Sequence, residues 1–268
     1  MESNLLETTI EDVLGTAFAD VEGDLLVVDP SAGTVVALVE TAVGRSDLPN
    51  LSLFVDERVL KDVMDDFLVA SRAADLVADG TLSIRTLPDR AENTLLVSED
   101  RVVVLVTTGS NVAALSTDDE AFVDTVADTY REAFAAAETY ELRTPPISRI
   151  RETMADEIGS DARADFDAML EAIEGTNGVL DEVTVSLLVA ARNEVLLYDV
   201  SKWGEDVGIA SKATFSRTKT RLEELGLIDT EKVPIDVGRP RLRLTLGDDR
   251  LIGTDVSDFP AIVAPLLG

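Results

Sequence analysis

One helix near the carboxyl end of the sequence constrains the fold most, because both of its ends can be recognised. Ser211 can cap its first turn by accepting a backbone hydrogen bond, and Gly226 supplies the left-handed residue that commonly ends a helix. Phe215, Leu222 and Leu225 recur at helical spacing and predict one apolar stripe. The opposite face carries small, hydroxyl and cationic side chains, a combination that suits the major groove of DNA.

The elements predicted around this helix occur in a specific order. They are helices at 185–192 and 199–207, a tight turn at 208–210, and strands at 230–236 and 241–246 around the turn at 237–240. Three helices followed by a hairpin with a basic tip predict a winged helix-turn-helix. The alternative, an isolated surface helix with a solvated charged face, does not account for five elements in this order.

Two motifs in this segment resemble archaeal winged-helix transcription regulators: Ser-Lys-Ala-Thr-Phe-Ser-Arg at 211–217 and Gly-Arg-Pro at 238–240. Arg217 lies opposite the apolar stripe and is expected to reach base edges, whereas Arg239 at the wing tip is expected to reach the minor groove or a phosphate. The residues expected to contact DNA are Ser211, Lys212, Thr214, Ser216, Arg217, Thr220, Arg221, Arg239 and Arg241.

The distribution of charge supports this interpretation although the chain as a whole is strongly acidic. The net charge is −29, but residues 1–189 hold 12 basic against 39 acidic side chains, while residues 190–250 hold 11 of each. Lysine occurs only five times. This composition resembles proteins of salt-accumulating haloarchaea, and the alternative of an acidic interaction tail fits less well because the acids are spread over apolar-periodic segments. In molar salt, where the Debye length is about 3 Å, specific binding must depend on base contacts, shape and dimeric symmetry.

Strands alternate with helices over residues 1–143, which predicts an α/β layered domain. A helix is expected at 5–19, a strand at 24–29 and a long helix from Asp56 to about residue 78, while 31–41 fits either a helix or a strand. The order of elements resembles the phospholipase D-like effector domain of archaeal sugar-sensing regulators of the TrmB type. Hydrolases of that fold use paired histidines, and the chain contains none. The resemblance therefore implies a binding or dimerising domain rather than an enzyme.

Two consecutive prolines, Pro145 and Pro146, mark the end of this domain. Amphipathic helices are predicted at 147–158 and 161–173. They are either a linker that packs on its own chain or a dimerisation element that holds the DNA-binding domains of two chains about 34 Å apart. The predicted division of the chain is an α/β effector or dimerisation domain at 1–143, a helical linker at 144–178, a winged helix-turn-helix at 179–250 and a tail at 251–268.

Taken together, the chain resembles haloarchaeal regulators of the TrmB-suppressor type (TbsP). The resemblance implies a transcriptional regulator of central carbon metabolism, with promoter DNA as its partner. One winged helix per chain and the helices at 147–173 predict a homodimer. The first domain is expected to be a sensor or interaction platform, with a small-molecule metabolite as the candidate effector. In the TrmB regulators the winged helix comes first, so their sugar-binding residues cannot be transferred. The alternatives are an adaptor whose winged helix does not bind DNA, and an enzyme.

Other chemistry is weakly represented in the sequence. There is no phosphate-binding or dinucleotide-binding glycine motif and no ligand cluster with metal spacing, so neither a cofactor nor a metal is expected. The acids at 65–66 and 118–120 fit a solvated surface better than a cation site. The turns at 98–100 and 107–111 stand at strand ends, where α/β domains often bind ligands, but a hydroxyl-rich turn is more often only a turn. No apolar run approaches the roughly 20 residues of a membrane helix, and a cytoplasmic location is expected.

Overall fold

The computed structural model describes residues 4–5, 9–21, 23–108, 111–173, 180–234 and 240–267. The chain divides into two compact units, Met1–Leu142 and Arg143–Gly268. The α/β class of the first unit and the helix-turn-helix of the second agree with the fold predicted from the sequence.

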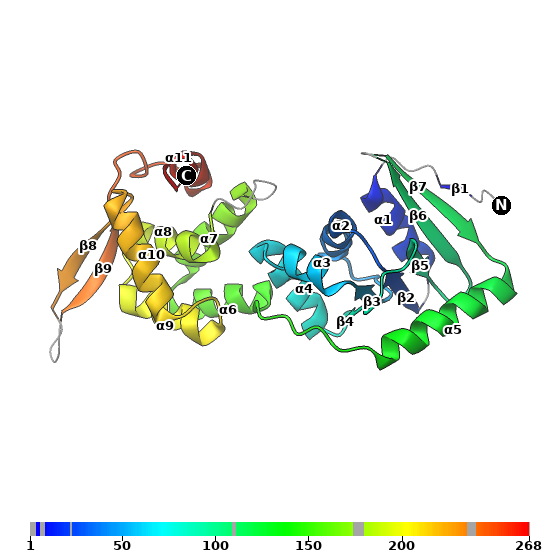
Figure 1. Ribbon diagram of the computed structural model, residues 1–268. Coiled ribbons are helices and arrows are strands. Elements are labelled where there is room, and N and C mark those ends of the chain that lie inside the picture. The colour runs from blue at the N-terminus through cyan, green and yellow to red at the C-terminus, as the bar shows by residue number, and fades with distance from the viewer. Residues whose placement is uncertain are drawn as a thin grey trace. The chain divides into compact units, whose positions relative to one another are not determined.

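The first unit is built on a mixed seven-stranded sheet of order β1-β7-β6-β5-β2-β3-β4 (Figure 1). Strands β2, β3 and β4 are parallel, whereas β5, β6, β7 and β1 continue the sheet in antiparallel pairs. The strands are β1 (Asn4–Leu5), β2 (Asp24–Val28), β3 (Asn50–Val55), β4 (Leu82–Thr86), β5 (Thr94–Val97), β6 (Val102–Thr108) and β7 (Asn111–Thr117).

Helices cover the two faces of this sheet unequally. One face carries α1 (Ile10–Asp20), α2 (Ala32–Ala42), α3 (Glu57–Val63) and α4 (Phe67–Ala78), and the other carries α5 (Glu120–Ala136). Alternate residues of each strand point to opposite faces, so Leu25 and Val27 of β2 join the larger core while Leu26 and Val28 pack under α5.

Two predicted helices of this unit differ from the structure. The helix expected at 5–19 begins only at Ile10, after the cap Thr9, and Leu5 is in strand β1. The long helix predicted after Asp56 is two helices, because Asp66 accepts a hydrogen bond from the amide of Val69 and starts α4 after a break. The undecided segment 31–41 is helical, with Ser31 as its cap. Asp66 and Asp119 both serve as helix caps, which gives these acidic side chains a structural role.

The second unit contains the helix-turn-helix and the two helices that precede it. Its elements are α6 (Ile147–Glu157), α7 (Ser160–Ile173), α8 (Glu182–Arg192), α9 (Leu197–Val207), α10 (Lys212–Glu224), β8 (Ile228–Val233), β9 (Arg241–Leu246), a 3-10 turn (Val256–Asp258) and α11 (Phe259–Leu267).

Helices α6 and α7 bury their apolar side chains within their own unit. Ile150, Met154, Phe166 and Met169 are at most 1% exposed. The Trp203 indole of α9 donates a hydrogen bond to Thr153 of α6 at 3.0 Å. Of the two roles left open by the sequence, these contacts correspond to packing on the same chain.

The hairpin is joined to the helices through a third extended segment that the sequence did not reveal. Leu196, between α8 and α9, forms an antiparallel bridge with Arg243 of β9, and the amide of Leu244 donates to the carbonyl of Val195 at 2.9 Å. Strands β8 and β9 pair in register from Ile228 with Leu246 to Val233 with Arg241. This bridge fixes the hairpin against α8, which is buried along almost its whole length.

Across the described part of the chain, no helix has the length and apolarity needed to cross a membrane. Within the same residues, no three His, Cys, Asp or Glu side chains come together as a metal site.

Candidate nucleic-acid interface

The orientation of α10 follows from its cap and its buried side. Ser211 accepts a hydrogen bond from the amide of Thr214 at 3.2 Å, as the sequence predicted. Phe215 and Leu222 are fully buried. Leu225 is 37% exposed, so its assignment to the buried stripe was wrong; Leu227, just beyond the helix, is buried in its place. Gly226 has a φ of 70° and ends the helix as expected.

The turn between α9 and α10 brings the two helices into very close contact. Gly208 ends α9 with a φ of 97°, a conformation that favours glycine. Gly204, inside α9, faces the ring of Phe215, and a Cβ atom at this position would lie 2.3 Å from two ring carbons. The absence of a side chain at residue 204 therefore sets how α10 lies on α9.

The face of α10 opposite Phe215 presents Ser216, Arg217 and Thr220, all exposed. The Arg217 guanidinium donates to the Thr214 hydroxyl at 3.3 Å, and the Thr220 hydroxyl donates to the carbonyl of Ser216 at 3.0 Å. These contacts orient the side chains without neutralising the arginine. Of the residues predicted on this helix, Ser216, Arg217 and Thr220 thus lie together on one exposed face.

Most cations of this unit are paired with carboxylates. The basic side chains described between 180 and 250 that lie within 4 Å of a carboxylate are Arg192, Lys202, Lys212, Lys219, Arg241, Arg243 and Arg250. Within the described residues, Arg217, Arg221 and Lys232 are the cations of this range without such a partner. This difference separates the predicted DNA contacts into two groups.

Lys212 belongs to the paired group. Its ammonium lies 2.5 Å from Glu205 of α9, and its backbone amide donates to the same carboxylate at 3.2 Å. The hydrogen bond to Lys212 lowers the pKa of Glu205, and the reciprocal hydrogen bond raises the pKa of Lys212. Both groups therefore stay charged around neutral pH, and Glu205 competes with any phosphate for this lysine.

Two further predicted residues are also engaged. Arg221 donates to the carbonyl of Leu267 in α11 at 2.7 Å, which ties it to the tail. Arg241 donates to Asp199 at 3.3 Å and lies over the ring of Tyr198, 4.3 Å from its centroid. Arg239, the predicted wing-tip contact, lies outside the described residues.

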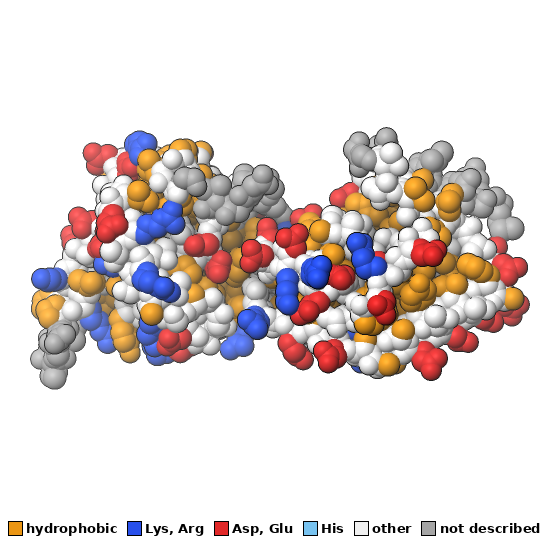
Figure 2. Space-filling view, in the orientation of Figure 1, with side chains coloured by type: hydrophobic (Ala, Val, Ile, Leu, Met, Phe, Trp, Pro, Cys, Tyr) orange, Lys and Arg blue, Asp and Glu red, His pale blue; other side chains and the backbone are white. Residues whose placement is uncertain are grey.

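Lys232 is a candidate contact that the sequence interpretation missed. It is exposed on β8 and lies opposite Leu242 in the hairpin. Alternation did not mark this lysine, because Lys232 shares the face of β8 that carries buried Ile228. Figure 2 shows Lys and Arg side chains, interspersed with Asp and Glu, over the part of the second unit that carries α10 in Figure 1.

A helix bundle whose third helix is exposed on one face, followed by a hairpin bridged back to the first helices, defines a winged helix-turn-helix protein. The sequence matches two models of one family. The amino-terminal model of the TbsP-like transcriptional regulators matches residues 2–145, and their carboxy-terminal helix-turn-helix model matches residues 146–264. The chain therefore belongs to the TbsP-like transcriptional regulators, as its resemblance in sequence indicated.

Two solved structures show more distant similarity. One is TrmBL2, described as an archaeal chromatin protein with a novel mode of DNA binding, at 14% identity and a TM-score of 0.38, covering 52% of this chain and 55% of that one. The other is Nuc, a phospholipase D family member from Salmonella typhimurium, at 10% identity and a TM-score of 0.35, covering 52% of this chain and 95% of that one. The chain thus spans about half the length of TrmBL2. Likeness at these scores assigns no activity to it. No curated protein matches the sequence.

Proposed function

We propose that the chain is a sequence-specific DNA-binding regulator whose helix α10 enters the major groove. The observation that carries this proposal is Arg217, an exposed arginine without a carboxylate partner, flanked by Ser216 and Thr220 on the outer face of α10. An arginine so placed can donate two hydrogen bonds to a guanine edge. The buried Phe215 and Leu222 hold the helix that presents it.

The pairing of cations and acids explains how such an interface works in an acidic protein. Because residues 190–250 carry equal numbers of basic and acidic side chains, this segment does not strongly repel DNA. It also offers few free cations to phosphates, so the nonspecific electrostatic contribution to binding is small. Discrimination between sequences then depends mainly on base contacts from Arg217 and on the fit of α10.

The first unit is proposed to act as a sensor or interaction platform, and the regulated genes are proposed to belong to central carbon metabolism. Its α/β layers support the former, because ligands often bind at the strand ends of such sheets. The family resemblance supports the proposed regulation of carbon-metabolism genes.

A homodimer is proposed because each chain carries one winged helix, and a pseudo-palindromic site needs two.

Genome-wide immunoprecipitation with and without glucose tests the proposal, combined with footprinting of the recovered promoters by purified protein. We expect protected half-sites about 34 Å apart and occupancy that changes with carbon source. Recovery of protein partners without any DNA footprint would instead support the adaptor. If the footprinted sites are occupied equally with and without glucose, the DNA-binding role is supported but the proposed role in carbon metabolism is rejected.

A further inference from the structure

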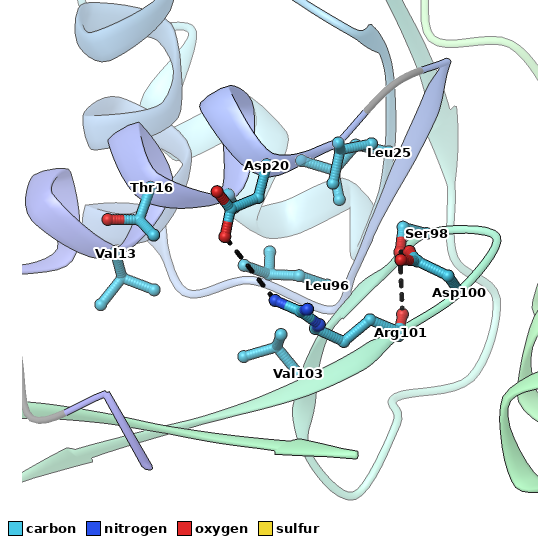
Figure 3. A pocket seen from close by; sticks show the side chains of 11 residues that line it. Val13, Thr16, Asp20, Leu25, Leu96, Ser98, Asp100, Arg101 and Val103 are labelled. Atoms are coloured by element: carbon cyan, nitrogen blue, oxygen red, sulfur yellow. Dashed lines mark hydrogen bonds and ion pairs between the residues drawn. The ribbon is translucent and has the colours of Figure 1, made fainter. Parts of the chain in front are cut away.

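A small cavity in the first unit lies between α1 and the end of the β5–β6 hairpin (Figure 3). Its volume of about 40 Å³ exceeds the roughly 10–15 Å³ that one water molecule needs. Apolar side chains from three strands and α1 form most of its wall: Val13, Ala17, Val21, Leu25, Leu96 and Val103. A ligand that fills this space must therefore present a hydrocarbon surface.

Among the described residues that line the cavity, Arg101 is the one cation. Its side chain reaches from the hairpin toward Asp20 on α1, beside Leu96 and Val103 (Figure 3). The distance to the Asp20 carboxylate is 3.7 Å, and the two side chains are 43% and 55% exposed. An exposed pair at this distance contributes little to stability. The guanidinium thus keeps donors that a better-placed carboxylate can use in a bidentate contact.

The other polar side chains of the lining are Thr16, Asp20, Ser98 and Asp100. The Ser98 hydroxyl lies 2.7 Å from the carboxylate of Asp100 and 3.2 Å from the carbonyl of Arg101, so its hydrogen-bonding capacity is already used within the turn. A polyhydroxylated ligand would place most of its hydroxyl groups against apolar walls, and unpaired buried polar groups are unfavourable.

We propose that this cavity binds a small organic monocarboxylate with a short hydrocarbon body. The hydrocarbon packs on Ala17, Leu96 and Val103, and the carboxylate replaces Asp20 as the partner of Arg101. On binding, the ion pair between Asp20 of α1 and Arg101 of the β5–β6 turn is lost. Both elements then contact the ligand instead of each other. This inference deepens the proposed sensor role of the first unit, while the binding itself does not depend on that role.

Ligand-detected NMR on the full-length protein in molar KCl tests the inference, with 3-methylbutanoate as the probe and 3-methylbutanamide and glucose as comparisons. We expect binding of the carboxylate, binding at least about tenfold weaker for the amide, and none for glucose. Arg101→Gln should weaken the carboxylate about tenfold or more. Asp20→Asn should strengthen it about two- to fivefold by removing the competitor.

Two further variants separate the site from general effects. Ala17→Leu fills the cavity without touching Arg101 and should abolish binding, while Arg58→Gln removes an exposed arginine of α3 and should leave binding unchanged. Melting temperatures confirm that each variant is folded. Equal binding by wild type, Arg101→Gln and Ala17→Leu would overturn the inference, as would amide or glucose binding equal to that of the carboxylate. Promoter affinity of the same variants, measured separately, reports on the proposed DNA-binding function.

Discussion

Ion pairs around α10 determine which of its cations are free to meet DNA. Lys212 is held by Glu205, so Glu205→Gln should release the lysine, remove one negative charge, and raise promoter affinity several-fold. Glu224→Gln, which removes the same charge from an exposed position on α10, is the control and should change affinity less. Because the pKa of Glu205 is lowered and that of Lys212 is raised, the gain should be constant from about pH 6 to pH 8. Equal gains in both variants, measured by fluorescence anisotropy, would mean that only net charge matters.

A second residue-scale prediction concerns Asp248, which follows β9. Hydrogen bonds from the Arg250 side chain and backbone lower the pKa of Asp248 to about 2. A carboxyl group with a depressed pKa stabilises the fold above its unfolded value, and that contribution is lost as the pH falls toward 2. Asp248→Asn should therefore lower the melting temperature near pH 6, and the difference from wild type should shrink as the pH approaches 2. If the difference in melting temperature between wild type and Asp248→Asn does not change with pH, it does not arise from the ionisation of Asp248.

At the scale of elements, the contact between α9 and α10 is the most sensitive point of the second unit. Replacing an exposed helical glycine by alanine normally stabilises a protein by about 1 kcal/mol. Gly204→Ala should do the opposite, because its Cβ would overlap the ring of buried Phe215, and overpacking costs about 1–3 kcal/mol. Gly33→Ala in α2 is the matched control, since the nearest atom there is 4.0 Å away. Denaturant unfolding that shows both variants to be equally stable would contradict the close packing.

The order of the helices and strands could largely be predicted from the sequence, because periodicity and caps are local signals. The cap at Ser211 and the left-handed Gly226 are examples. Contacts between distant segments could not be predicted in this way. The bridge from Leu196 to Arg243 and the engagement of Arg241 by Asp199 depend on tertiary packing. Leu225 was misplaced because helical spacing does not show where the chain turns away from the core.

For the whole molecule, the division into two units predicts that their functions can be separated. Removing residues 1–142 should leave a fragment that binds promoter DNA, because the apolar faces of α6 and α7 are buried within the second unit. The same fragment should no longer respond to carbon source, measured as reporter expression with and without glucose. A normal response from the fragment would place the sensor outside the first unit.

The proposed homodimer can be tested on the intact chain. Light scattering in molar KCl should give twice the mass of the 28.8 kDa chain, with and without promoter DNA. A monomer under both conditions would contradict the proposal of paired half-sites. It would leave recognition by a single α10 untouched.

The central claim is that α10 recognises a specific DNA sequence. The most direct test measures the affinity of the Arg217→Ala variant for a footprinted promoter and for random DNA. A bidentate contact between arginine and guanine contributes about 1–3 kcal/mol of discrimination, so promoter affinity should fall about tenfold or more while affinity for random DNA changes little. Arg221→Ala, whose side chain is bound to the Leu267 carbonyl, should have a smaller effect on discrimination. Unchanged promoter affinity in a folded Arg217→Ala protein would contradict the account.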